Sequence, residues 1–268
     1  MSGSRETLRA TFDEDAELYA RARPVCPDVL VEAIDRRLAT AHPRTLEIGC
    51  GTGQATVALA RRGHRVVAVE LGGDLARVAR RTLVAFPQVE VVHADIERWE
   101  PATAGFDLVV CATAFHWLDP ATRFARVARL LRPGGLLALV QTLHVSGPSD
   151  AFFADLQSSC YARWMPDAPA HLPLVSISAL PSRSAYGLED AEEFTAPEML
   201  RVPVDLSYDA ERYVDLLRTF SNHRALPAAR LDGLLACIRA RIATERECPT
   251  NGVTGPLAPG VSRGKDQS

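Results

Sequence analysis

Short apolar segments alternate with longer segments of helical periodicity between Arg44 and Val145. The short segments are rich in β-branched residues, which favour strands, and the longer ones repeat apolar residues every three or four positions, as one helix face requires. This alternation is typical of a parallel sheet whose strands are joined by helices. The predicted strands are Thr45–Ile48, Arg65–Glu70, Val89–Ala94, Phe106–Thr113 and Leu136–Leu143.

The helices predicted between these strands have recognisable ends. Gln54–Arg62 is followed by a glycine, and Asp74 is expected to cap a second helix that a proline stops. Asp119-Pro120 is expected to begin a third helix, because proline is well tolerated at the first helical position. Strands and helices therefore alternate regularly up to residue 145.

The chain after residue 145 follows a different pattern. Residues 146–197 are rich in proline, serine and aromatic side chains and predict a cap inserted over one edge of the sheet. A sixth strand is expected at Met199–Leu206, and helices at Asp209–Phe220 and Pro227–Ala243. The predicted fold class is α/β, a Rossmann-like doubly wound, mostly parallel sheet. One domain covers residues 1–247 with core motifs at 44–145, and residues 248–268 are expected to form a disordered tail.

The number and type of basic residues exclude several classes of enzyme mechanism and of binding partner. Lys265 is the only lysine, so 29 of the 30 basic residues are arginine, and mechanisms that need a lysine within the fold are excluded. The formal net charge of −3 indicates no broad basic surface, so no nucleic-acid partner is expected.

Cysteine spacing and hydropathy indicate a cytoplasmic protein. Six cysteines stand at irregular spacings without a C-x-x-C pair, which favours reduced, mostly buried thiols over disulfides or a metal site. No apolar run has the length of a membrane span, and the charged N-terminal segment does not resemble a secretory signal. Neither a membrane partner nor a metal is expected.

A glycine loop follows the first predicted strand and opens a helix. Gly49, Gly51 and Gly53 allow the backbone to turn sharply and approach a ligand, and the helix N-terminus offers free N–H groups. The dinucleotide fingerprint requires a small residue where this chain has Gln54 or Thr56. A nicotinamide dehydrogenase is therefore disfavoured.

Three successive strands end in an acidic residue. Glu47 precedes the glycine loop, where it would repel a pyrophosphate and attract a ligand carrying ammonium and sulfonium groups. Glu70 is placed to accept both hydroxyls of a ribose, and Asp95 to accept from an adenine amino group. Open parallel sheets bind ligands at this carboxyl edge.

Taken in order, these motifs resemble those of the class I S-adenosylmethionine-dependent methyltransferases, in particular the small-molecule group with the "methyltransferase type 11" core. The resemblance covers roughly residues 8 to 243. It rests on LEIGCGTGQAT at 46–56, VVAVEL at 66–71, VEVVHADIE at 89–97, FDLVVCATAFHWLD at 106–119 and LRPGGLLALV at 131–140.

The resemblance implies S-adenosylmethionine as cofactor and assigns it contacts. The loop, Gly49-Cys50-Gly51-Thr52-Gly53, would surround the methionine part, with Glu47 orienting it and Glu70 holding the ribose. Leu71 would pack on the adenine, and Asp95 with the Ile96 amide would read its edge, although core packing remains an alternative for both apolar side chains. Ala112 and Thr113 would contact the amino-acid end.

The acceptor is expected to be a small organic molecule. His116 is the candidate base, with a local structural role as the alternative, and Trp117 stands beside it. His144 and His223 are weaker candidates for the substrate pocket. The segment around Tyr19 and Arg23 resembles a lid motif of this group that would exclude water over the cofactor, with cysteine at position 26 in place of the usual tyrosine.

The same resemblance leaves one alternative function open and shows one strand in which this chain differs from the family. A catalytically silent paralogue that binds the cofactor as a partner or regulatory module is the alternative to an enzyme. The family's sheet normally ends with a seventh strand that inserts antiparallel between strands five and six. The Gly/Pro-rich residues after Cys248 contain no β-branched run, so we predict that this strand is missing or replaced.

Overall fold

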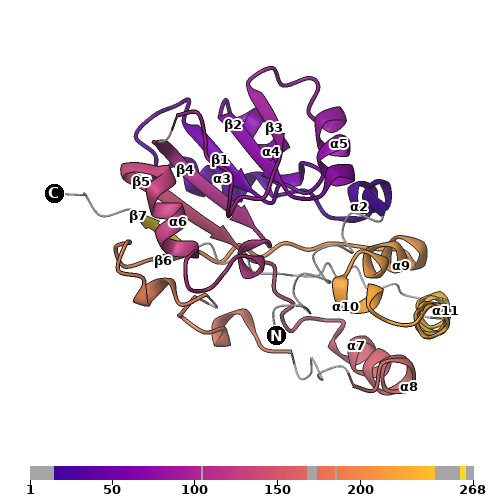
Figure 1. The fold of residues 1–268 in the computed structure, drawn as a ribbon. Coiled ribbons are helices and arrows are strands. Elements are labelled where there is room, and N and C mark those ends of the chain that lie inside the picture. The colour runs from indigo at the N-terminus through magenta and orange to yellow at the C-terminus, as the bar shows by residue number, and fades with distance from the viewer. Residues whose placement is uncertain (1–14, 104, 168–173, 185, 245–259, 264–268) are drawn as a thin grey trace. The chain divides into compact units, whose positions relative to one another are not determined.

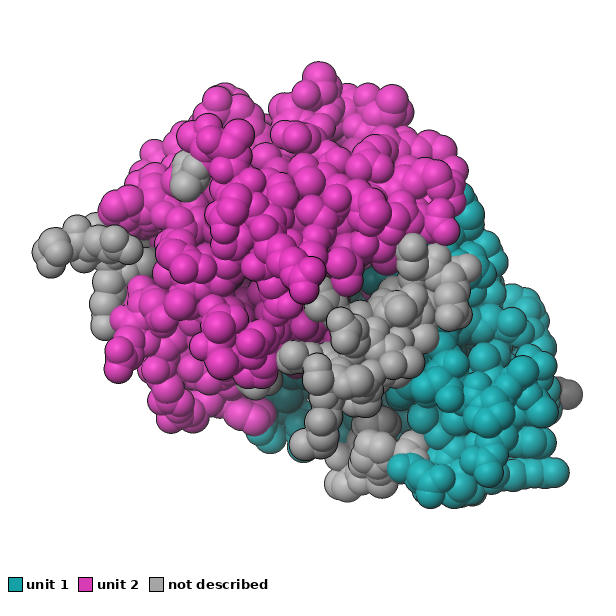
Figure 2. Space-filling view, viewed as in Figure 1, with its two compact units in different colours: residues 1–23, 143–180, 203–256 teal, residues 24–142, 181–202, 257–268 magenta. Residues whose placement is uncertain are grey.

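The computed structural model describes residues 15–103, 105–167, 174–184, 186–244 and 260–263. The chain divides into two compact units, which Figure 2 colours separately. The sheet unit comprises residues 24–142, 181–202 and 257–268, and the helical unit comprises residues 1–23, 143–180 and 203–256.

The sheet unit contains a sheet in the order β3-β2-β1-β4-β5-β7-β6 (Figure 1). Its first five strands are parallel, which confirms the predicted fold class. The strands are β1 (Arg44–Ile48), β2 (Arg65–Glu70), β3 (Val89–His93), β4 (Phe106–Ala112), β5 (Leu131–Val140), β6 (Glu198–Met199) and β7 (Gly260–Arg263).

Helices of the sheet unit pack against these strands. In the described residues α4 lies against β2, α5 against β2 and β3, and α6 against β4 and β5. The helices and short helical turns are α3 (Asp28–Asp35), α4 (Gln54–Arg61), α5 (Gly73–Thr82), η2 (Phe115–Trp117), α6 (Arg123–Leu130) and η5 (Leu188–Asp190). The N-cap of α5 is Gly72, and Asp74 lies inside the first turn, where it pairs with Arg77. The prediction that Asp74 caps this helix is therefore wrong.

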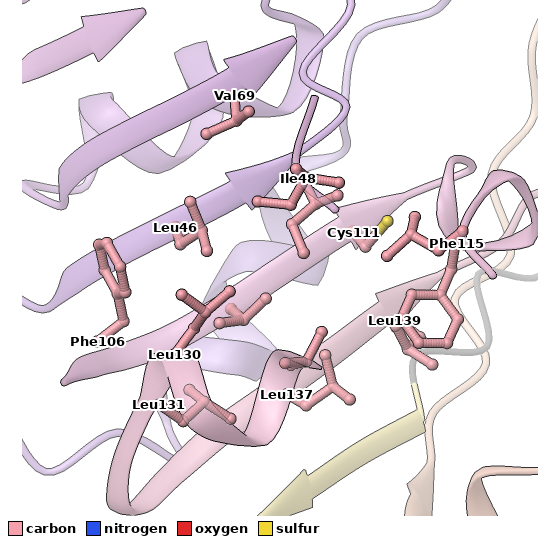
Figure 3. Packing of buried hydrophobic residues seen from close by; sticks show 14 of the residues in the cluster. Leu46, Ile48, Val69, Phe106, Cys111, Phe115, Leu130, Leu131, Leu137 and Leu139 are labelled. Atoms are coloured by element: carbon pink, nitrogen blue, oxygen red, sulfur yellow. The ribbon is translucent and has the colours of Figure 1, made fainter. Parts of the chain in front are cut away.

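Apolar side chains of the central strands form the main core of the sheet unit (Figure 3). Leu46, Val109 and Leu137 come from three adjacent strands and are completely buried. Fully covered parallel strands have continuous apolar runs, which is why the sequence located β1, β2 and β4 within one or two residues.

Two boundaries in the middle of the chain differ from the predictions. The helix predicted from Asp119-Pro120 begins only at Arg123, with Thr122 as its N-cap. β5 begins at Leu131, because that residue already pairs with Phe106, and the register then shifts before Leu136 pairs with Leu108. Pro133, Gly134 and Gly135 lie in this irregular part of the strand.

The last two strands correct two further predictions. The prediction of a missing seventh strand is wrong, because Gly260–Arg263 forms β7 antiparallel to both β5 and β6. Residues 248–259 and 264–268 of the predicted tail lie outside the described residues. The strand predicted at Met199–Leu206 is confined to Glu198–Met199, since these are the residues that pair with β7. Backbone pairing on both sides thus makes a strand of a segment without a β-branched run.

The helical unit is built from α2 (Ala16–Ala22), α7 (Asp150–Leu156), the π-helical turn η3 (Gln157–Tyr161), α8 (Ala162–Trp164), η4 (Ile177–Ala179), α9 (Ala210–Arg218), α10 (Ser221–Arg224) and α11 (Ala228–Thr244). Asp209 caps α9 by accepting a hydrogen bond from the Arg212 amide. α9 and α11 lie within a residue or two of their predicted ranges. None of the helices in the described residues is long and apolar enough to cross a membrane.

A disulfide joins Cys160 to Cys237 within the helical unit. Their Cα atoms are 5.7 Å apart, a distance that a disulfide readily spans. The prediction of reduced thiols is therefore wrong for this pair, although Cys26, Cys50 and Cys111 are free. Cysteine spacing alone could not reveal the pair, because its members are 77 positions apart in the chain.

Candidate cofactor site

The glycine loop turns on left-handed backbone at the carboxyl end of β1. Gly49, Gly51 and Gly53 have φ values of 69°, 57° and 98°. At Gly49 a Cβ atom would lie 2.6 Å from the Cβ of Ala114, so a side chain would collide with the segment after β4. The loop therefore needs glycine both for its conformation and for close packing.

Glu47 is buried beneath this loop, with 1% of its surface exposed. Its Oε2 accepts a hydrogen bond from the Thr56 hydroxyl at 2.7 Å. Burial raises the pKa of Glu47 to about 8, the hydrogen bond from Thr56 opposes that rise, and the charge of Glu70 adds to it. Glu47 is thus a carboxyl group that a nearby cation would bring to its charged form.

Glu70 uses both carboxylate oxygens to hold backbone amides. Oε2 accepts from the Gly51 amide at 2.8 Å, and Oε1 accepts from the Gly72 amide at 2.9 Å. These bonds fix the glycine loop against the end of β2.

The residues expected to contact adenine have different surroundings. Leu71 is 41% exposed, so it is not part of the core, whereas the Ile96 side chain is 5% exposed and packs in the main cluster. Asp95 is half-buried at the end of the third strand, and its Oδ1 accepts from the Glu97 amide at 3.1 Å. An exposed leucine between Glu70 and Gly72 is suited to cover an apolar ring face.

The segment after β4 approaches the glycine loop. Ala112 ends the strand, and Thr113 has a φ of 53°, the one positive value among the described residues other than glycine. His116 is exposed, and its ring lies 4.6 Å from that of Trp117. Neighbouring protein atoms that partly displace water from the ring, and the charge of Arg123, lower the pKa of His116, which favours its neutral imidazole. A neutral imidazole is the form that accepts a proton.

Four of the predicted pocket residues lie in the helical unit, and three of them are linked there through Phe220. The guanidinium carbon of Arg23 lies 5.0 Å from the Tyr19 ring centroid and 4.7 Å from that of Phe220. The Phe220 ring is 5.7 Å from His223, which is buried. His144 belongs to the same unit and is exposed.

The sequence does not predict the role of two residues in these arrangements. In the sequence Thr56 is only a misfit to the dinucleotide fingerprint, yet in the structure it holds Glu47. The sequence signal that could have indicated this contact is the position of Thr56 in the first turn of α4, directly after the glycine loop. Tyr161, one of several aromatic residues in the predicted cap, hydrogen bonds to His223 with 3.1 Å between Oη and Nε2. These partners are 62 positions apart in the chain, which leaves no such signal.

Comparisons with known proteins agree with this geometry. A family described as methyltransferase domain matches residues 45–135, which include the glycine loop and the acidic ends of the first three strands. An uncharacterized methyltransferase of Mycobacterium tuberculosis is 39% identical over 140 residues, 52% of this chain and 55% of that protein. The trans-aconitate 2-methyltransferase of Azoarcus sp. is 36% identical over 121 residues, 44% of this chain and 46% of that protein. The chain thus spans about half the length of the curated relatives it matches.

A solved structure from Anaeromyxobacter dehalogenans, assigned as a type II methyltransferase, has the same fold. Its TM-score is 0.60 at 24% identity, covering 91% of this chain and 97% of that one. Residues 45–135 therefore match a methyltransferase domain in sequence, and the chain shares its fold with a solved methyltransferase structure.

Proposed function

We propose that this chain transfers a methyl group from S-adenosylmethionine to a small organic acceptor and releases S-adenosylhomocysteine. The observation that carries the proposal is the arrangement of Glu47 and Glu70 around the glycine loop at one sheet edge. One carboxyl group is buried where an ammonium and a sulfonium would bring it to its charged form. The other, at the end of β2, would accept from the hydroxyls of a ribose. This donor and acceptor set suits S-adenosylmethionine.

The chain's own residues would bind and orient the reactants. Gly49-Cys50-Gly51-Thr52-Gly53, Ala112 and Thr113 would surround the amino-acid end, and Leu71, Asp95 and the Ile96 amide would receive the adenine. When bound, S-adenosylmethionine supplies a methyl carbon activated by its sulfonium, and the electron pair of the broken C–S bond stays on sulfur. Positioning is the main contribution that such a reaction asks of a protein.

His116 would serve as the base for an acceptor that is protonated at working pH. Its lowered pKa favours the neutral imidazole, which would take the acceptor proton as the new bond to carbon forms. Trp117 would form part of the acceptor's surroundings. A base is unnecessary for an acceptor that is already an anion. The name of the Azoarcus relative gives such an acceptor, the carboxylate trans-aconitate.

Substitution of Glu70 tests the assignment of the cofactor site. We expect Glu70→Ala to weaken S-adenosylhomocysteine binding by about 100-fold, because two charge-assisted hydrogen bonds to ribose and the anchoring of Gly51 are lost together. Calorimetry measures this affinity, and Glu90→Ala, an exposed acidic residue of β3, is the matched control. Unchanged affinity in Glu70→Ala would show that the placement is wrong. Binding without any methyl transfer to a panel of phenols, carboxylates and amines would favour the silent binding module.

A further inference from the structure

Arg126 of α6 is a buried cation whose guanidinium holds the turn that follows β3. The residue is 7% exposed. Its Nε donates a hydrogen bond to the Ile96 carbonyl at 3.2 Å, and its Nη2 donates to the Trp99 carbonyl. Its Nη1 donates to the Glu100 carboxylate at 2.5 Å, which balances the charge. All four residues lie in the sheet unit, so the guanidinium joins two segments of one compact body.

The turn that Arg126 holds comprises residues 95–99 and includes both groups proposed to receive the adenine edge, the Asp95 carboxylate and the Ile96 amide. The Asp95 carbonyl accepts from the Trp99 amide at 2.8 Å, which closes the turn. The Asp95 Oδ1 accepts from the Glu97 amide at 3.1 Å. The position of the Asp95 side chain therefore depends on the backbone of this turn.

One peptide group of the turn connects Arg126 to Asp95. The peptide between Ile96 and Glu97 accepts a hydrogen bond at its oxygen from Arg126 Nε and donates one from its nitrogen to Asp95 Oδ1. A peptide group is planar and rigid, so a bond that fixes its oxygen also fixes the direction of its N–H. Hydrogen bonds that share a group in this way also polarise each other. Through this peptide, the guanidinium orients the Asp95 carboxylate.

Core packing alone does not account for an arginine at this position. Burial of a charge is costly, and an apolar side chain usually fills a core position at lower cost. Val127 and Leu130, the other buried residues of α6, are apolar. We propose that Arg126 is a positioning residue of the cofactor site, which sets the selectivity of the site for adenine by holding Asp95 and the Ile96 amide in place. This inference rests on the proposed function, to which it adds a residue that acts through Asp95.

S-adenosylhomocysteine and S-inosylhomocysteine test the inference, because they differ only in the base edge that the turn would receive. Adenine offers an amino donor and a ring-nitrogen acceptor, whereas hypoxanthine offers a carbonyl and a ring N–H at the same two positions. We expect calorimetry to show that the wild-type chain prefers the adenine compound by about 100-fold, since a charged acceptor loses its donor in the other. Arg126→Met should reduce this preference by about 10-fold, and Arg126→Lys should reduce it less. Arg129→Met, at an exposed position of the same helix, should leave it unchanged.

A double-variant cycle separates positioning from a general loss of stability. In an Asp95→Ala background, Arg126→Met should have little further effect on the preference, because the carboxylate that it orients is gone. Chemical denaturation shows which variants are folded, and Arg126→Lys takes the place of Arg126→Met in the cycle if the latter does not fold.

Three results would overturn the inference. They are a wild-type chain that binds both compounds equally, full preference in every folded Arg126 variant, and an equal loss of preference with and without the Asp95 carboxylate. Absence of S-adenosylhomocysteine binding by the wild-type chain would instead overturn the proposed function.

Discussion

The sheet unit is stabilised by adjacent strands that share one large apolar core, whereas the helical unit has a smaller core of helix-borne side chains and a disulfide. In the sheet unit, neighbouring strands supply completely buried residues such as Leu46 and Leu137. In the helical unit, Leu156, Leu234 and Ile238 pack around the bridge between Cys160 and Cys237. A small core gains more from a covalent link than a large one.

Buried polar groups have hydrogen-bond partners in both units. In the sheet unit, Glu47 accepts from the Thr56 hydroxyl and Glu70 accepts from two backbone amides. In the helical unit, the Tyr161 hydroxyl and His223 Nε2 form a hydrogen bond, and Arg23 donates to the Thr219 carbonyl. Each unit also contains a buried side-chain atom without a hydrogen-bond partner among the described residues, Glu189 Oε2 in the sheet unit and Arg23 Nε in the helical unit.

Removal of the disulfide should produce the largest difference between the units. Cys160→Ala with Cys237→Ala is expected to destabilise the helical unit by about 2–4 kcal/mol, because the link limits the unfolded chain. Hydrogen exchange should therefore accelerate in α11 more than in β4. A reductant should act in the same way on the wild-type chain and have no further effect on the double variant. Equal exchange in α11 with and without reductant would contradict the bridge.

One crowded glycine in each unit allows the packing to be compared. A Cβ at Gly233 would lie 2.5 Å from the Trp164 ring, so Gly233→Ala should cost about 1–3 kcal/mol despite alanine's higher helix propensity. Gly49→Ala should cost a similar amount and also weaken cofactor binding, because its Cβ would meet Ala114. Chemical denaturation measures both free energies.

Two uncrowded glycines serve as controls for that comparison. Among the residues that the structure describes, no atom lies within 4 Å of a Cβ built at Gly147 or Gly134, although Gly134 has a φ of 69°. Gly147→Ala should therefore be nearly neutral, and Gly134→Ala should show the cost of the backbone conformation alone. If Gly233→Ala were as stable as Gly147→Ala, the close contact with Trp164 would be wrong.

The smallest expected effect concerns one proton in the sheet unit. Glu47 has a pKa of about 8, so it is protonated at pH 7 in the cofactor-free protein. A cation bound beside it lowers that pKa, so binding should release a proton and affinity should rise with pH until it levels off near pH 8. Calorimetry in two buffers of different ionisation enthalpy measures the number of protons released for each cofactor molecule bound. Glu47→Gln should release fewer protons than wild type, and equal release would show that another group is responsible.

The sequence predicted the sheet unit in more detail than the helical unit. Each central strand carries its own apolar run, and Glu47, Glu70 and Asp95 follow from their positions at strand ends. The sequence did not predict β7, because this strand depends on backbone pairing with β5 and β6 rather than on its own residues. It did not predict the disulfide either, because the two cysteines are distant in the chain.

The sequence by itself determined the class of fold, the glycine loop and the acidic strand ends, since these depend on local periodicity and on residues close together in the chain. Only the tertiary structure decided that Glu70 holds the amides of Gly51 and Gly72, and that Thr56 holds Glu47. It also decided that Arg23, Phe220 and His223 share one neighbourhood. Contacts between distant segments depend on how elements pack, and no local pattern of residues records that packing.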